Sequence, residues 1–333
     1  MNSPKQKNAP LVDQFQRHIE YARIAVTAHC NLRCTYCMRE EHEYHTIADP
    51  ELSSREVGKI IVALASIGIK KIRFTGGEPL LRKDISVLVR QAKSIAGIKT
   101  VSLTTNGILL DRHLDELIDA GLDAINLSLD TLDRERYLAI TRRNEFDRVM
   151  SNLETLLAKA TFPVKLNVVM MRGVNGDEIK DFIELTRTHS LTVRFMELQP
   201  FDDNQIWKTG KFMGIDKITE QLRSLNPGVQ KKQGKSTEYF SFSLPGHQGS
   251  IAVIPAYTRN FCSSCNRIRI TSHGKIISCL YDKEGLDLMP LLRNNADNNM
   301  LTELFRHAAA HKPADGKSAA EGQTRTSMSE IGG

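Results

Sequence analysis

The chain has 333 residues, of which 41% are hydrophobic and 25% are charged, and its formal net charge is +6. This composition excludes a chain that is disordered throughout, and the longest apolar run, residues 60–69, is too short to cross a membrane, which takes about 20 residues. The opening MNSPKQKNAP has no apolar core, so we expect no secretory signal and a cytoplasmic location, where cysteines more often serve as metal ligands or catalysts than in disulfides. The mild positive charge suits a polyanionic ligand such as a nucleotide.

Short β-rich segments alternate with amphipathic segments from residue 23 to about 200. In the segment 53–67 apolar residues recur with the period of a helix, Ser53 and Glu56 predict a capping box at its start, and Gly68 predicts its end. Further helices are predicted from Asp111 to Gly121 and around 179–185. The predicted strands are 23–29, 71–75, 100–104, 124–129, 164–169 and 192–198.

Six strands, each followed by a helix, predict an α/β fold with a parallel sheet. Because the count stops at six, we expect an incomplete (β/α)6 TIM-like barrel, with its site at the carboxyl ends of the strands. The segments 75–79 (TGGEP), 104–107 (TTNG) and 128–130 (SLD) lie at such ends. After residue 200 the alternation is lost: residues 236–254 read as hairpin-like strands, and a helix is predicted around 301–310.

The six cysteines form two triplets with none left over, Cys30, Cys34 and Cys37 (C-x3-C-x2-C) and Cys262, Cys265 and Cys279 (C-x2-C-x13-C). A structural zinc ion takes four protein ligands, and each triplet supplies three. A zinc site would need a histidine to complete each triplet, and the nearby candidates are His29, His42, His45 and His273. A [4Fe–4S] cluster held by three thiolates, with one iron left open for a ligand, fits better.

The first triplet followed by a strand-end GGEP resembles the radical S-adenosylmethionine (SAM) superfamily. The resemblance implies that Cys30, Cys34 and Cys37 hold a cluster whose open iron binds SAM, and that one electron then cleaves SAM to methionine and a 5′-deoxyadenosyl radical. It also implies a set of SAM contacts, in which Gln199 occupies the position of an expected methionine and Met196 lies three residues earlier. These contacts are Tyr36, Gly77, Ser128 and Gln199, and Glu78 is expected to accept a hydrogen bond from the SAM ammonium group.

Nearly the whole chain resembles the GTP 3′,8-cyclases within that superfamily. The resemblance rests on residues 73–82 (RFTGGEPLLR), on the block FCxxCNRxRxTxxGxxxxCL at 261–280, and on the final Gly332 and Gly333. It implies that the second triplet holds a second [4Fe–4S] cluster facing the guanine base, and that the two terminal glycines reach the active site and are needed for turnover. The GTP site would be lined by Arg23, Arg73, Thr104, Lys165, Arg267 and Arg269.

The implied organisation has four parts: an N-terminal arm (1–22), a radical SAM partial barrel (23–200), a C-terminal region with the auxiliary cluster and the substrate site (201–311), and a flexible tail (312–333). No phosphate-binding loop G-x4-G-K-[ST] occurs, since the Gly-Lys-Ser sequences at 234 and 316 lack the earlier glycine. A triphosphate would therefore depend on side-chain cations.

The reaction implied by the resemblance starts with abstraction of hydrogen from C3′ of GTP by the deoxyadenosyl radical. The C3′ radical then attacks C8, and reduction and protonation give (8S)-3′,8-cyclo-7,8-dihydroguanosine 5′-triphosphate, the first step of molybdenum cofactor biosynthesis. The implied partners are a second copy of the chain, an electron-donor protein and, as the next enzyme, cyclic pyranopterin monophosphate synthase, with no DNA and no membrane.

Two alternatives remain open from the sequence. One is a radical SAM enzyme with an auxiliary cluster that modifies a peptide or another small molecule. The other is a zinc-binding interaction module in which histidines complete both cysteine triplets.

Overall fold

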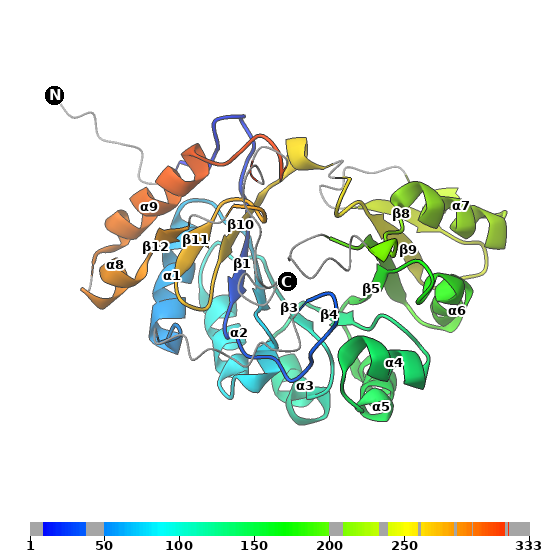
Figure 1. Cartoon of the computed structure of the whole chain (residues 1–333). Helices are drawn as coiled ribbons and strands as arrows, with labels where there is room; N and C mark the ends of the chain where they lie inside the picture. Colours follow the sequence, from blue (N-terminus) through cyan, green and yellow to red (C-terminus); the bar gives the residue numbers. More distant parts are fainter. Residues whose placement is uncertain are drawn as a thin grey trace.

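The computed structural model describes residues 9–37, 50–199, 209–232, 239–258, 261–282, 285–294, 296–316 and 319. Within these residues one twelve-stranded sheet forms, in the order β12-β11-β10-β1-β2-β3-β4-β5-β6-β9-β8-β7. The sheet curves around a central space, and its two ends do not pair with each other (Figure 1). Its strands are β1 (Tyr21–Ala25), β2 (Lys71–Thr75), β3 (Thr100–Thr105), β4 (Ala124–Ser128), β5 (Val164–Met170), β6 (Leu191–Glu197), β7 (Gln230–Lys231), β8 (Phe240–Ser243), β9 (Ser250–Ile254), β10 (Arg267–Ile270), β11 (Lys275–Ile277) and β12 (Leu286–Asp287).

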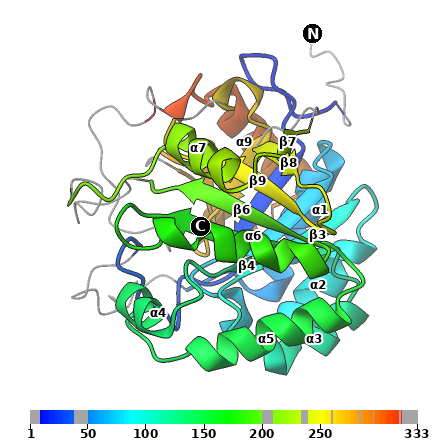
Figure 2. The same cartoon turned by 90° about the vertical axis from the view of Figure 1, so that its right-hand side faces the viewer.

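Strands β1 to β6 are parallel neighbours in chain order, so the predicted partial barrel is confirmed. The helices between them lie on the outer side of the sheet, as parallel strands joined by helical crossovers require. Figure 2 shows α6 and α7 outside the half of the sheet that holds β6 and β9. The helices are α1 (Ser54–Ser66), α2 (Ile85–Ser94), α3 (Leu110–Asp119), α4 (Arg134–Thr141), α5 (Phe146–Lys159), α6 (Ile179–Thr188), α7 (Ile215–Leu225), α8 (Met289–Arg293) and α9 (Asn298–Ala310).

The chain after residue 200 extends the sheet at both ends. Strand β9 pairs in parallel with β6 and carries the antiparallel β8 and β7, as the predicted hairpin-like segment requires. Strand β10 pairs in parallel with β1 and carries the antiparallel β11 and β12. The second cysteine triplet is thereby brought to the same sheet as the first.

The start of α1 and the end of β1 show how neighbouring residues determine the bounds of helices and strands. The capping box at α1 is confirmed, because the Ser53 amide donates to the Glu56 carboxylate over 2.8 Å and the Glu56 amide donates to the Ser53 hydroxyl over 3.3 Å. Such a cap stabilises a helix by about 1 kcal/mol. The first strand was predicted over 23–29 but ends at Ala25, because residues 27–29 pair with the turn after β2 rather than with its strand.

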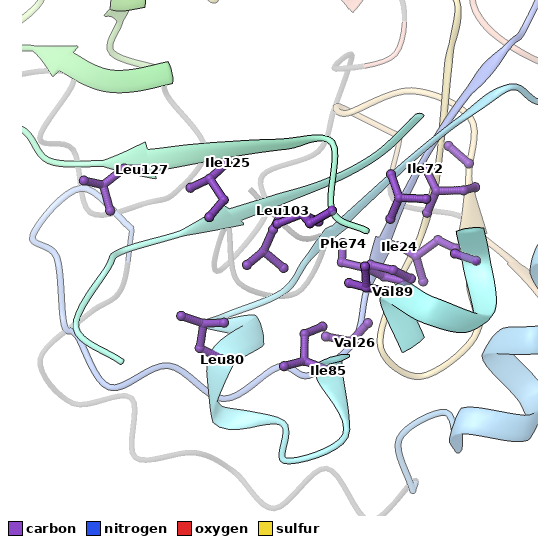
Figure 3. Packing of buried hydrophobic residues seen from close by; sticks show 14 of the residues in the cluster. Ile24, Val26, Ile72, Phe74, Leu80, Ile85, Val89, Leu103, Ile125 and Leu127 are labelled. Atoms are coloured by element: carbon purple, nitrogen blue, oxygen red, sulfur yellow. The ribbon is translucent and has the colours of Figure 1, made fainter. Parts of the chain in front are cut away.

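A continuous apolar core fills the space between the sheet and the outer helices (Figure 3). It draws on alternate strand residues such as Ile24, Ile72 and Phe74, and on helix residues such as Ile85 and Val89, all of which have no exposed surface. The opposite face of the same strands carries polar side chains, because successive residues of a strand point to opposite faces. Among the described residues, no helix has the length and apolar character needed to cross a membrane.

Candidate active site

One cavity of about 360 Å³ lies on the inner face of the sheet, at the carboxyl ends of its strands. All six cysteines line this cavity, although the two triplets are far apart in the sequence. Of the residues predicted to bind SAM or GTP that the structure describes, Lys165 alone is not in the lining. Those in the lining are Arg23, Tyr36, Arg73, Gly77, Glu78, Thr104, Ser128, Gln199, Arg267 and Arg269.

The first cysteine loop is held against the glycine turn that follows β2. The Gly77 amide donates to the Thr27 carbonyl over 2.8 Å, and the Glu78 amide donates to the His29 carbonyl over 2.7 Å. A Cβ atom on Gly77 would lie 2.2 Å from the His29 oxygen, and one on Gly76, whose φ is +152°, would lie 2.4 Å from the Thr27 oxygen. These glycines are therefore needed by the protein's own packing, because no other residue allows so close an approach.

The sulfur of Cys30 is approached by two N–H groups, the Leu32 amide at 3.4 Å and the Asn106 side-chain amide at 3.9 Å. Burial, followed by the nearby carboxylate of Glu78, raises the pKa of Cys30 to about 11. Burial also raises the pKa of Cys34, and Cys37 and Cys30 add to this effect. Cys34 thus neighbours both Cys30 and Cys37 in one partly buried site, where a cation would favour the thiolates.

Glu78 joins the ends of β2 and β3. Its carboxylate accepts hydrogen bonds from the Thr105 hydroxyl and the Asn106 amide, both at 2.7 Å, and from the Leu80 amide at 3.0 Å. Burial raises its pKa to about 7, although these hydrogen bonds oppose the shift. The carboxylate therefore holds Asn106 beside Cys30, in addition to facing the cavity.

Tyr36 is fixed by Asp130, at the end of β4. The Tyr36 hydroxyl donates to one carboxylate oxygen of Asp130 over 2.5 Å, and the Val169 amide donates to the other over 2.8 Å. Burial raises the pKa of Asp130 to about 6, against the effect of these two bonds. Asp130 thus ties the first cysteine loop to β4 and β5.

The second cysteine triplet has a different electrostatic setting. Burial disfavours the thiolate of Cys265, but the positive charges of Arg267 and Lys312 outweigh burial and lower its pKa to about 6. The pKa of Cys279 is raised, mainly by burial. The Cys265 amide donates to the Cys262 carbonyl over 3.1 Å, which closes a tight turn between the two cysteines.

Arginines from β10, β1 and β2 form a row across the inner face of the sheet. Arg269 lies opposite Arg23, and Arg23 lies opposite Arg73. The ring of Tyr21 lies 5.5 Å from the guanidinium of Arg23 and 5.2 Å from that of Arg73. Burial, together with the positive charges of Arg23 and Arg267, lowers the pKa of Arg269. Clustered cations of this kind favour a polyanion.

Lys165 lies on β5 two residues before Asn167, which lines the cavity. Since alternate residues share a face, Lys165 belongs to the inner face but nearer the amino end of the strand. Gln199 and Met196 both line the cavity, and the side-chain amide of Gln199 donates to the Ala256 carbonyl over 2.9 Å.

The buried polar residues of the cavity that were not predicted from the sequence include Asn167, Arg194 and Lys312. The Arg194 guanidinium donates to the Asn167 side chain over 2.8 Å. Asn167 and Arg194 could have been found from the sequence, because each is a polar residue at a strand position that faces the inner side of the sheet. Lys312 was assigned to the flexible tail, yet it is only 3% exposed.

Some predicted residues lie outside the site or outside the described residues. Gly332, Gly333, His42 and His45 belong to the part of the chain that the structure does not describe. His273 does not line the cavity. Within the described residues, no three His, Cys, Asp or Glu side chains are arranged to hold a single metal ion.

Two family models match consecutive parts of the chain, the radical SAM superfamily over residues 24–186 and Molybdenum Cofactor Synthesis C over residues 191–318. The SAM-bound structure of SuiB from Streptococcus suis has a TM-score of 0.59 at 16% identity, covering 91% of this chain and 69% of that one, and it supports the fold alone.

Curated relatives match along the full length. The GTP 3′,8-cyclase of Chlorobaculum tepidum is 54% identical over 100% of both chains. That of Heliobacterium modesticaldum is 41% identical over 97% of this chain and 100% of the relative, and the mitochondrial GTP 3′,8-cyclase of Arabidopsis thaliana is 40% identical over 91% and 78%. With both family models and relatives of this identity along its whole length, the chain belongs to the GTP 3′,8-cyclase family of radical SAM enzymes.

Proposed function

We propose that the chain converts GTP to (8S)-3′,8-cyclo-7,8-dihydroguanosine 5′-triphosphate, the first step of molybdenum cofactor biosynthesis. The observation that carries the proposal is that one cavity is lined by both cysteine triplets and by Arg23, Arg73, Arg267 and Arg269. A site for SAM and a site for a triphosphate would then share one cavity. A radical formed at one would act on a substrate held in the same cavity, and positioning is what such an unselective species requires.

The first triplet has the donor set for a [4Fe–4S] cluster. The three thiols are mutual neighbours, and N–H groups of Leu32 and Asn106 point at the Cys30 sulfur, as hydrogen bonds to cluster thiolates do. A cluster held by Cys30, Cys34 and Cys37 would supply the electron that cleaves SAM to methionine and a deoxyadenosyl radical. The residues proposed to bind SAM are Tyr36, Gly77, Ser128 and Gln199, with Glu78 facing the same space.

The second triplet is proposed to hold a second [4Fe–4S] cluster through Cys262, Cys265 and Cys279. The lowered pKa of Cys265 favours thiolate ligation, and the triplet lies on the GTP side of the cavity beside Arg267. A structural zinc ion takes four protein ligands, and each triplet supplies three. The donor set therefore favours a larger cluster with an open iron for the guanine base.

The arginine row is proposed to bind the triphosphate. Arg269 is 6% exposed and next to Arg23 and Arg267, so its positive charge is poorly solvated and repelled until an anion arrives. Thr104 faces the cavity from β3, and Arg73 from β2. Lys165 is proposed to contact the substrate from the floor of the inner face, beyond the described lining.

The outer parts of the chain have proposed roles as well. We keep the division into an arm (1–22), a barrel (23–200), an auxiliary-cluster region (201–311) and a tail (312–333), with Gly332 and Gly333 required for turnover. Strand pairing between β1 and β10 makes the barrel and the auxiliary-cluster region share one sheet. A homodimer, an electron-donor protein and a synthase that consumes the cyclised triphosphate are the proposed partners.

Anaerobic incubation of reconstituted protein with SAM, a reductant and GTP tests the function. We expect 5′-deoxyadenosine and a cyclised guanosine triphosphate in equal amounts, detected by liquid chromatography and mass spectrometry. With GTP deuterated at C3′, the label should appear in deoxyadenosine. Deoxyadenosine without a GTP-derived product would reject the cyclase and favour a radical SAM enzyme with another substrate.

A further inference from the structure

Lys312 is a buried cation that lies between the two chain segments that carry Cys265 and Cys279. It is 3% exposed and lines the cavity. Its ammonium group donates to the Arg267 carbonyl over 3.0 Å and also to the Ser278 carbonyl. Arg267 lies two residues after Cys265, and Ser278 immediately precedes Cys279. One side chain therefore joins the two segments that carry these cysteines.

The positive charge of Lys312 has no carboxylate partner among the described residues, since its hydrogen bonds go to backbone carbonyls. Arg17, another buried cation nearby, differs because Asp13 neutralises it over 2.5 Å. Burial lowers the pKa of Lys312, and Cys265 and Cys279, which line the same cavity, oppose this shift when they are ionised. A buried ammonium ion is costly unless an anion compensates it, so the triplet and Lys312 are electrostatic partners.

The segment that carries Lys312 is also connected to Cys262, the remaining cysteine of the triplet, through Arg17. The Arg17 guanidinium donates to the Pro313 carbonyl over 2.6 Å, to the Ala314 carbonyl over 2.9 Å and to the Cys262 carbonyl over 2.8 Å. All three cysteines of the triplet are thus connected to residues 312–314. The position of the ammonium relative to the sulfurs is set by the fold and not by a free side chain.

We propose that Lys312 is a positioning residue for the second cysteine triplet and provides the fixed counter-charge of the [4Fe–4S] cluster held there. The proposal rests on the second cluster of the proposed function. Reduction adds negative charge to a cluster, and a fixed positive charge beside it stabilises the reduced form. Lys312 therefore raises the reduction potential of the second cluster and leaves that of the first unchanged.

The test measures each cluster by itself in the full-length chain. In one background Cys30, Cys34 and Cys37 are replaced by alanine, and in the other Cys262, Cys265 and Cys279 are replaced. Into each we introduce Lys312→Met, which keeps the side-chain length but removes the charge, and Lys312→Arg, which keeps the charge. Lys93→Met, which removes a half-buried cation paired with Asp123 on the outer side, is the matched control. Iron content and an electron paramagnetic resonance redox titration are the readouts.

We expect Lys312→Met to shift the oxidised-to-reduced ratio of the second cluster about tenfold toward oxidised, equivalent to about 59 mV for one electron. Lys312→Arg should keep a potential close to that of the unsubstituted protein. Lys93→Met should leave the second cluster unshifted, and the potential of the first cluster should not change in any variant. If Lys312→Met fails to fold, Lys312→Gln replaces it, because Gln keeps a donor without the charge. Loss of iron from the second triplet in the uncharged variants but not in Lys312→Arg also supports the proposal.

Two outcomes overturn the inference and are distinguishable. An unchanged potential in Lys312→Met with full iron content, or equal iron loss in Lys312→Met and Lys312→Arg, refutes the role of the charge and leaves the second cluster intact. A parent variant without the first triplet that binds no iron refutes the second cluster itself, and the inference with it.

Discussion

Arg269 on β10 lies directly opposite Arg23 on β1, in a parallel register that places two guanidinium groups side by side on the inner face of the sheet. Nη1 of Arg269 has no hydrogen-bond partner in the part of the chain that the structure describes. Such a pair opposes folding and favours a bound polyanion.

Replacing Arg269 should affect the stability of the protein and its affinity for GTP in opposite directions. We expect Arg269→Met to raise the melting temperature of the nucleotide-free protein by a few degrees, because a poorly solvated, repelled charge is removed. The same variant should bind GTP at least tenfold more weakly, since hydrogen bonds to charged groups contribute about 1.5–3 kcal/mol. Differential scanning fluorimetry and calorimetric titration measure the two effects. The exposed Arg90→Met is the control, and a loss of stability in Arg269→Met would contradict the expectation.

The contact between Tyr36 and Asp130 predicts a specific effect on SAM. Asp130→Asn leaves only one acceptor oxygen for two donors, the Tyr36 hydroxyl and the Val169 amide. We expect SAM to bind about tenfold more weakly while GTP binding is unchanged. Tyr36→Phe should produce a similar loss, and the double variant should lose less than the sum, because the two residues act through one contact. Asp133→Asn, at the exposed start of α4, is the matched control, and fully additive losses would refute the coupling.

The two triplets should differ in reactivity before metal is bound. The pKa of Cys265 is about 6 and that of Cys30 about 11, and the thiolate is the reactive form. Above pH 6 the metal-free protein should therefore be alkylated first at Cys265, whereas Cys30 should stay a thiol until the pH approaches 11. Iodoacetamide labelling from pH 5 to 10, with peptide mass spectrometry, gives both profiles. Equal labelling rates at pH 7 would be inconsistent with this order.

The glycine turn after β2 predicts loss of one cluster only. Gly77→Ala places a Cβ atom 2.2 Å from the His29 carbonyl oxygen, which must displace the first cysteine loop. Overpacking of this kind costs about 1–3 kcal/mol. We expect the variant to lose the iron of the first triplet and keep that of the second. Gly228→Ala, whose Cβ atom would meet nothing nearer than 3.4 Å, should keep both, and iron analysis with Mössbauer spectroscopy compares them.

The barrel could be predicted from the sequence because the patterns that indicate it lie within short stretches of the chain. The capping box at Ser53 and Glu56, the apolar periods and the alternation of strand and helix each act within a few residues. The cysteine spacings also predicted which groups would gather in one place. What could not be predicted was the pairing of β10 with β1 and of β9 with β6, because each joins segments far apart in the chain.

The site residues that sequence analysis did not identify were missed for one physical reason: their burial depends on contacts with distant parts of the chain. Arg194 and Asn167 are polar residues within mostly apolar strands, and only the face of the strand on which they lie distinguishes a buried contact from a solvated one. Lys312 stands at the start of a polar, glycine-containing segment that resembles a tail, and its burial depends on carbonyl groups of Arg267 and Ser278. Composition alone does not report such contacts.

The pairing of β1 with β10 has a consequence for biosynthesis of the chain. A ribosome releases β1 before β2 to β9 and releases β10 after them, so this edge of the nascent barrel stays open while the strands between them are made. Chains that terminate early would keep this edge and are expected to aggregate instead of accumulating as inactive folded protein. Chaperones that shield unpaired strands should therefore matter more for this enzyme than for a closed barrel of similar size.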